Sequence, residues 1–191
     1  MDNWPEIFAV VTGLLYIYLE IKQKPSMWVV GFISSLVFVF VYFQSKLYAS
    51  SALSVYYVAI SVYGWYSWRY ARQPDGAISE LQVSRLRKSM AMVLGFIAAI
   101  LFAGIGYILY KFTNSNVPYP DALVFSLCVV ATWMLARKIL EHWILWIFIN
   151  FFSSALYFSQ ELYFTAGLFV VYGVLSVVGW LKWKQTMHRF T

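Results

Sequence analysis

Seven long segments of the sequence contain no charged side chain, and this constrains the fold more than any other feature. They are residues 7–19, 29–43, 47–68, 90–110, 122–136, 143–160 and 162–181. With their apolar flanks, they form helices of about 17 residues or more, enough to cross a hydrocarbon core of about 30 Å. The chain is 62% hydrophobic and only 12% charged, which is too little charge for a soluble surface. The sequence therefore predicts an all-α membrane protein with seven transmembrane helices, at 4–22, 27–44, 49–69, 89–111, 120–137, 141–159 and 163–183.

Lysine and arginine residues gather on one side of the predicted membrane. When the connections are assigned alternately to the two sides, only Lys46 and Lys111 of the 14 Lys and Arg residues fall opposite the C-terminus. By the positive-inside rule, the N-terminus lies outside and the C-terminus in the cytoplasm, with the chain in the inner (plasma) membrane. The net charge of +6 thus reflects orientation and gives no reason to expect a nucleic-acid partner. The acidic N-terminus lacks a basic signal-peptide region, so we expect the first helix to be retained.

The polar parts of the chain offer little chemistry. The connector 70–88 contains a turn signal at 73–76 and a basic stretch that is compatible with a short surface helix. The single cysteine, Cys128, excludes an intramolecular disulfide and a cysteine-based metal cluster. His142 and His188 are predicted at the membrane interfaces, without partners at metal-ligand spacing. We therefore expect no metal and no cofactor.

The chain repeats itself at an offset of 115 residues. Residues 42–69 align with 157–184 without gaps and share 12 identities in 28 positions. This register predicts two parallel three-helix repeats joined by a fourth helix, a 3+1+3 arrangement with a pseudo-twofold axis along the membrane normal. The expected divisions are 1–70 for the first repeat, 71–113 for the connector and linking helix, 114–185 for the second repeat, and 186–191 for a cytoplasmic tail. Parallel repeats are a transporter architecture with the substrate site near the midplane.

The sixth predicted helix carries the strongest candidate site. Trp143, Trp146 and Asn150 share one helix face, and Asn150 lies roughly 13 Å into the membrane. Their repeat partners are Trp28, Gly31 and Ser35. Because Trp146 and Asn150 break the repeat, they are better ligand candidates than the matched Trp143. The alternatives are that the tryptophans mark the membrane interface and that Asn150 clamps another helix.

Other residues can line the path of a solute. Tyr57 and Tyr172 are repeat partners, and Ser35 is the partner of Asn150; hydroxyl groups at these depths can also bond to their own helix. Glu20, near the end of the first helix, either pairs with nearby lysines or faces a cationic substrate. We therefore include Tyr57, Tyr172, Ser35 and Glu20 among the candidate substrate-binding residues.

A GWxxW motif occurs twice, at 64–68 and 179–183. Both copies lie at predicted cytoplasmic helix ends, where tryptophan commonly anchors a helix at the interface. The two glycines are expected to allow close helix packing.

The deep parts of the predicted helices contain no ionisable relay, and the chain has no P-loop motif. This pattern favours facilitated diffusion, with aromatic faces holding a flat, preferably cationic, ring. No catalytic constellation lies at membrane depth, so we expect no enzyme. A sugar facilitator of the same layout and a sensor or membrane enzyme are the alternatives from other classes.

The chain resembles the PnuC family of vitamin transporters over nearly its whole length. The resemblance rests on LYASSALSVYYVAISVYGWYSW, RKILEHWILWIFIN and LYFTAGLFVVYGVLSVVGW, together with the predicted layout. It implies a homotrimeric facilitator of an unphosphorylated vitamin that a cytoplasmic kinase then traps, and it implies that Trp143, Trp146 and Asn150 stack on and hydrogen-bond the substrate. The family includes carriers of nicotinamide riboside and of thiamine. The ending Tyr18-Leu19-Glu20 looks more like the thiamine branch, with nicotinamide riboside as the alternative.

Overall fold

The structure, a computed structural model, describes residues 4–45, 48–72, 78–113 and 117–188. Its helices are α1 (Trp4–Ile21), α2 (Ser26–Gln44), α3 (Tyr48–Arg69), α4 (Lys88–Phe112), α5 (Pro118–Ala136), α6 (His142–Ser159) and α7 (Tyr163–His188). The predicted all-α membrane fold with seven helices is confirmed. Each helix end lies within two residues of its prediction except the end of α7, which runs on to His188 because the polar residues after Trp183 include no helix breaker.

Six of the described helices are long and apolar enough to cross a membrane. The exception is α3, which has the required length, 22 residues, but is rich in serine and tyrosine. Two of its buried serines are satisfied within α3: Ser54 donates to the carbonyl of Ser50, and Ser61 donates to that of Tyr57. Because α3 contacts both α2 and α5, these polar groups face other helices.

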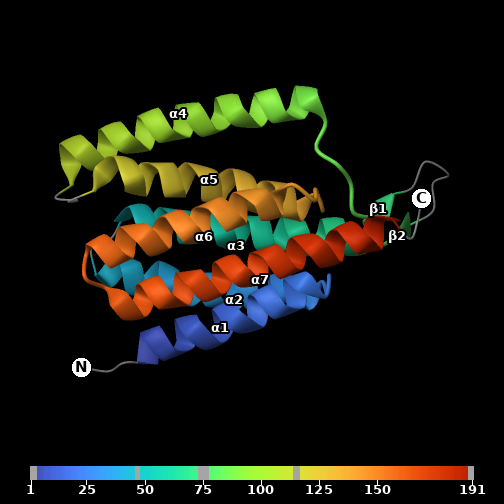
Figure 1. Cartoon of the computed structure of the whole chain (residues 1–191), viewed down its shortest axis with the longest axis horizontal. Helices are drawn as coiled ribbons and strands as arrows, with labels where there is room; N and C mark the ends of the chain where they lie inside the picture. The colour runs from blue at the N-terminus through green and yellow to red at the C-terminus, as the bar shows by residue number, and fades with distance from the viewer. Residues whose placement is uncertain (1–3, 46–47, 73–77, 114–116, 189–191) are drawn as a thin grey trace.

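Helix contacts follow the repeat. The tightest pairs are α2 with α3 and α6 with α7, which are equivalent in the two repeats, and α1–α2 corresponds to α5–α6. The two halves meet through α3–α5 and α1–α7, again an equivalent pair. Helix α4 packs on α5 along one edge of the bundle, at the opposite side from α1 (Figure 1). The 3+1+3 division remains a prediction. The helix contacts are consistent with it, because each contact within the first repeat has an equivalent in the second.

Individual hydrogen bonds repeat as well. Ser51 donates to the carbonyl of Val39 at 3.1 Å, and Ser154 donates to that of Ala166 at 2.9 Å. Ser51 corresponds to Ala166 in the repeat, and Val39 corresponds to Ser154. The two bonds therefore join the same pair of repeat positions, but the serine is at the opposite position in each. The turns after α1 and α5 contain equivalent residues in the left-handed conformation, Gln23 (φ 55°) and Lys138 (φ 48°).

Four tryptophans form a buried layer between the halves near the end of the bundle that carries the connector, called here the basic end. This tryptophan layer consists of Trp28, Trp68, Trp143 and Trp183. Trp68 donates to the carbonyl of Leu135, and Trp183 donates to that of Glu20, both at 3.1 Å. Leu135 and Glu20 are themselves repeat partners, so the two bonds cross the axis reciprocally.

The interfacial interpretation of the GWxxW motifs is therefore wrong for Trp68 and Trp183, whose side chains are fully buried. It fits Trp65, which is 37% exposed. The expected role of the glycines is met, because a Cβ atom on Gly64 would collide with the ring of Trp28, and one on Gly179 with the ring of Trp143. Each glycine thus admits the tryptophan of the neighbouring helix.

The connector forms no surface helix in its described part, although its basic stretch is compatible with one. Strands β1 (Ala71–Arg72) and β2 (Ile78–Ser79) pair antiparallel, and residues 78–87, the strap, continue extended across the basic end. The strap amides of Leu81 and Ser84 donate to the carbonyls of Trp68 and Lys138. These bonds to both repeats hold the strap extended. The predicted turn at 73–76 lies outside the described residues.

Candidate solute-binding site

A cavity of about 270 Å³ opens among α1, α2 and α3, with one residue each from α5 and α6. It is called here the solute cavity. Its lining consists of Ala9, Thr12, Gly13, Tyr16, Trp28, Val30, Gly31, Ser34, Ser35, Phe38, Tyr42, Tyr57, Ile60, Ser61, Thr132 and Trp146. It lies mostly within the first repeat and receives Trp146 from the second.

The asymmetry of the repeats explains where the cavity is. Trp146 has Gly31 as its repeat partner, so the first repeat lacks an indole where the second has one. A Cβ atom on Gly31 would lie 2.8 Å from the ring of Tyr16 and 3.3 Å from Ser61 Oγ. Glycine therefore keeps this wall of the cavity close to the backbone of α2.

The indole N–H groups of Trp146 and Trp28 are buried and have no hydrogen-bond partner in the described part of the protein. A buried donor without an acceptor costs about 1–3 kcal/mol. The indole N–H of Trp143 is likewise buried without a partner in the described residues. Of the three tryptophans, Trp28 and Trp146 line the solute cavity, so their N–H groups lie nearest to an acceptor on a bound solute. Trp146 also offers an aromatic face, which suits a flat or cationic ring.

The remaining polar lining is neutral. The hydroxyl groups of Thr12 and Ser34 lie 3.1 Å apart and bridge α1 and α2. Ser61 Oγ is held by the carbonyl of Tyr57 at 2.6 Å. The described lining residues include no Asp, Glu, Lys, Arg or His. The cavity can therefore accept an uncharged or cationic solute, but it offers no counter-charge to an anion.

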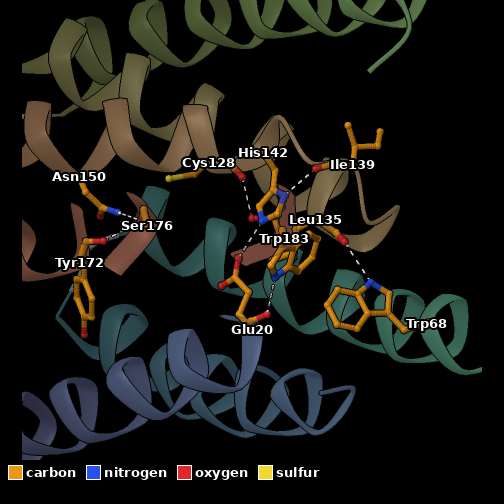
Figure 2. A network of polar contacts seen from close by, with 11 residues as sticks. Glu20, Trp68, Cys128, Leu135, Ile139, His142, Asn150, Tyr172, Ser176 and Trp183 are labelled. Carbon is orange, nitrogen blue, oxygen red and sulfur yellow. Dashed lines mark hydrogen bonds and ion pairs between the residues drawn. The ribbon is translucent and has the colours of Figure 1, made fainter. Parts of the chain in front are cut away.

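Of the residues predicted from the sequence, Trp146, Tyr57 and Ser35 line the cavity, whereas Trp143, Asn150, Tyr172 and Glu20 do not. Asn150 Nδ2 donates to Ser176 Oγ at 3.2 Å, and Ser176 donates to the carbonyl of Tyr172 (Figure 2). This bond joins α6 to α7, as the clamp alternative supposed. The side-chain oxygen of Asn150 makes no hydrogen bond within the described residues, and the residue lies one turn from Trp146.

Tyr172 lies at the margin of the cavity, whereas Trp143 lies in the tryptophan layer. The hydroxyl of Tyr172 reaches across to α1, where it occupies the space beside Gly13, a lining residue. Trp143 is fully buried in the tryptophan layer against Gly179. Its packing role matches that of Trp28, as expected for a conserved position of the internal repeat.

Glu20 makes neither of the contacts expected for it. Its carboxylate Oε1 lies 3.1 Å from Nε2 of His142, and both side chains are buried (Figure 2). His142 Nδ1 lies 2.7 Å from the carbonyl of Ile139, which can only accept, so Nδ1 carries a proton. The Nε2–Oε1 contact joins α6 to the end of α1. His142 was predicted at a membrane interface without a partner at metal-ligand spacing; its side chain is fully buried and pairs with Glu20.

Sequence reasoning missed the contribution of α1. Thr12, Gly13 and Tyr16 line the cavity on one helix face. The sequence does mark this region, because a polar residue and a glycine, Thr12 and Gly13, are adjacent in the middle of the first apolar segment. This pattern shows which face of the helix they occupy, but not which helix packs against that face.

A membrane-spanning bundle of two helix repeats, with an aromatic and neutral polar cavity between its helices, has the architecture of a small-solute transporter. The profile of the nicotinamide mononucleotide transporter family matches residues 3–185. The chain belongs to this family, and its resemblance to the PnuC transporters is confirmed.

Similar proteins include the nicotinamide riboside transporter PnuC of Escherichia coli, which is 27% identical over 81% of this chain and 74% of its own length. The riboflavin/roseoflavin transporter RibM of Streptomyces davaonensis is 26% identical over 80% of this chain and 71% of its own length. The crystal structure of the vitamin B3 transporter PnuC superposes with a TM-score of 0.76, at 24% identity, over 100% of this chain and 84% of that one. It shares the fold. None of these names supports the thiamine preference drawn from Tyr18-Leu19-Glu20.

Proposed function

We propose that this protein is a facilitated-diffusion transporter of nicotinamide riboside. The observation that carries the proposal is the solute cavity, which is aromatic and, in its described lining, uncharged, with Trp146 of the second repeat in its wall. The pyridinium ring of the nucleoside is cationic and suits the aromatic faces. Its ribose hydroxyls and carboxamide oxygen can accept from the indole and from the side-chain hydroxyls of the lining. The name of the Escherichia coli relative supports the same substrate.

The cavity favours the nucleoside over its phosphorylated form, although the family is named after a mononucleotide. A phosphate carries one to two negative charges near neutral pH, and burying such a group without a cationic partner is costly. The described lining residues of the solute cavity offer none. Phosphorylation inside the cell therefore converts a substrate into a molecule that cannot return.

The neutral lining of the solute cavity supports uncoupled transport, because proton and sodium relays use ionisable side chains along the solute path. The buried Glu20–His142 pair lies outside this lining. Transport then follows the gradient of the free vitamin, without chemical conversion by the protein, and a cytoplasmic vitamin kinase maintains that gradient. In this proposal the chain lies in the plasma membrane with the basic end in the cytoplasm. A homotrimer belongs to the same proposal, and the mass of the protein–detergent complex measures it.

Calorimetric titration of the purified protein tests the substrate. We expect nicotinamide riboside to bind, with thiamine and riboflavin weaker. Tighter binding of riboflavin, the vitamin in the name of the second relative, would reassign the substrate within the same transport class.

Uptake into proteoliposomes tests the mechanism. We expect uptake of labelled nicotinamide riboside to equilibrate without an imposed gradient and to exceed equilibrium only with the matching kinase and ATP enclosed. A strict requirement for a proton or sodium gradient would exclude facilitated diffusion.

A further inference from the structure

A second cavity, of about 450 Å³, lies at the basic end. Helix α1 passes the solute cavity first and then reaches the tryptophan layer at Glu20. Gln23, which lines the second cavity, follows just after the end of the helix. Its opposite wall includes Lys138, the repeat partner of Gln23. The cavity therefore lies near the pseudo-twofold axis, beyond the tryptophan layer, and the strap residues Ser79 to Val83 complete it.

Lys138 is the unusual member of this lining. Its side chain is only 4% exposed, and its ammonium lies 4.5 Å from the ring centre of Trp68. It makes no hydrogen bond or ion pair within the described residues. Burial lowers its pKa from an ordinary 10.5 to about 8, and the more distant Glu80 opposes this shift only in part. The protein thus places an ammonium, with three N–H donors, at the wall of a cavity and without a close anion.

We propose that this second cavity binds a phosphate monoester, namely the 5′-phosphate of the transported nucleoside, with Lys138 as the counter-charge. The proposal rests on the proposed function, which makes this phosphate the product that accumulates on the same side of the membrane.

The donors around Lys138 fit an oxyanion. Gln23 and Gln82 line the same cavity, and their side-chain amides can donate beside Lys138, so several phosphate oxygens can be bonded together. Glu80 is the one carboxylate among the described lining residues, and it is exposed, so water screens its repulsion. The volume exceeds that of an inorganic ion and leaves space for the nucleoside.

Such a ligand has a consequence for transport. It contacts the turn of the first repeat at Gln23, the turn of the second at Lys138 and the strap at Gln82. Binding to all three stabilises the closed basic end, because a ligand shifts a conformational equilibrium toward the state that it binds better. Accumulated product then slows further import.

Calorimetric titration of the purified full chain with nicotinamide mononucleotide tests the site. We expect Lys138→Met, which keeps the apolar stem over Trp68, to weaken binding by about tenfold or more. Lys138→Arg retains the charge and much of the affinity. Lys184→Met, at an exposed lysine of the same end, is the matched control and leaves binding unchanged. Nicotinamide riboside binds Lys138→Met as it binds the wild type, which also reports that the variant is folded.

Two further arms separate the sources of phosphate. Inorganic phosphate is expected to bind more weakly than the mononucleotide, and nanodiscs containing phosphatidylglycerol are expected to leave mononucleotide binding unchanged. Competition by this lipid would reassign the site to a lipid headgroup. Mononucleotide affinity equal in wild type and Lys138→Met, or displacement by saturating nicotinamide riboside, would overturn the proposal. Failure of nicotinamide riboside to bind, with Lys138-dependent mononucleotide binding intact, would instead overturn the proposed substrate.

Discussion

At the scale of single residues, Trp146 is the side chain on which solute binding depends most. It supplies both an aromatic face and an unpaired N–H to the solute cavity. We expect Trp146→Ala to weaken nicotinamide riboside binding by about fivefold or more, since stacking and one hydrogen bond together contribute about 1–3 kcal/mol. Calorimetry on purified protein measures the change.

Trp65→Ala is the matched control for this prediction. Trp65 is partly exposed at the basic end of α3 and lies outside the cavity lining. We expect its loss to leave the dissociation constant unchanged. Equal losses of affinity in the two variants would remove Trp146 from the site.

The Glu20–His142 pair is a buried contact between the repeats. Glu20→Ala leaves the Nε2 of His142 buried without its partner, and breaking such a pair costs roughly 3 kcal/mol or more. Glu20→Gln keeps a group that can donate to Nε2, so we expect a loss of only about 1 kcal/mol. The melting temperatures of Glu20→Ala and Glu20→Gln in detergent measure the two losses. Equal decreases in melting temperature would mean that the pair contributes packing alone.

Lys138 makes stability depend on pH in a defined direction. Its folded pKa is about 8, below its ordinary value of 10.5. Between these values the unfolded chain keeps the proton that the folded chain has lost, so raising the pH favours the folded state. In phosphate-free buffer, we expect the melting temperature of the wild type to rise relative to Lys138→Met from pH 8 to 10.5. A constant difference would contradict the lowered pKa.

At the scale of the helices, glycine decides how closely neighbours approach. A Cβ atom on Gly179 has no space beside the ring of Trp143, and overpacking of this kind costs about 1–3 kcal/mol. Gly95 of α4 has no neighbouring atom within 4 Å of its Cβ position. There we expect Gly95→Ala to be neutral or to stabilise by up to about 1 kcal/mol through helix propensity. Opposite shifts in melting temperature for Gly179→Ala and Gly95→Ala are the expected result.

At the scale of the whole molecule, the two halves are joined by equivalent bonds. Trp68 and Trp183 each donate to a carbonyl of the other repeat, and their ring centres lie 5.8 Å apart. We expect Trp68→Phe and Trp183→Phe to destabilise by similar amounts, about 1 kcal/mol each from the lost hydrogen bond. Because the rings touch, the double variant is expected to depart from additivity. Very different single effects in thermal melts would argue against equivalent roles.

Much of the architecture could be predicted because the bilayer fixes it. A membrane helix must carry an apolar surface across the hydrocarbon, so charged residues are confined to its ends. They therefore located every helix end to within two residues, except the end of α7, which extends beyond Trp183 to His188. The offset of 115 residues also gave the correct equivalences, and contacts such as Ser51–Val39 and Ser154–Ala166 recur at them. Trp146 was found because it breaks the repeat at Gly31.

What the sequence determined by itself is therefore the number of helices, their limits and the positions that correspond in the two halves. Only the tertiary structure decided which faces meet. A helical pattern gives the depth and face of a side chain, but not the residue opposite, so His142 looked interfacial although it packs against Glu20, 122 positions away. For the same reason, the tertiary structure alone located the cavity beside Gly31, the burial of Trp68 and Trp183, and Lys138 beneath the strap.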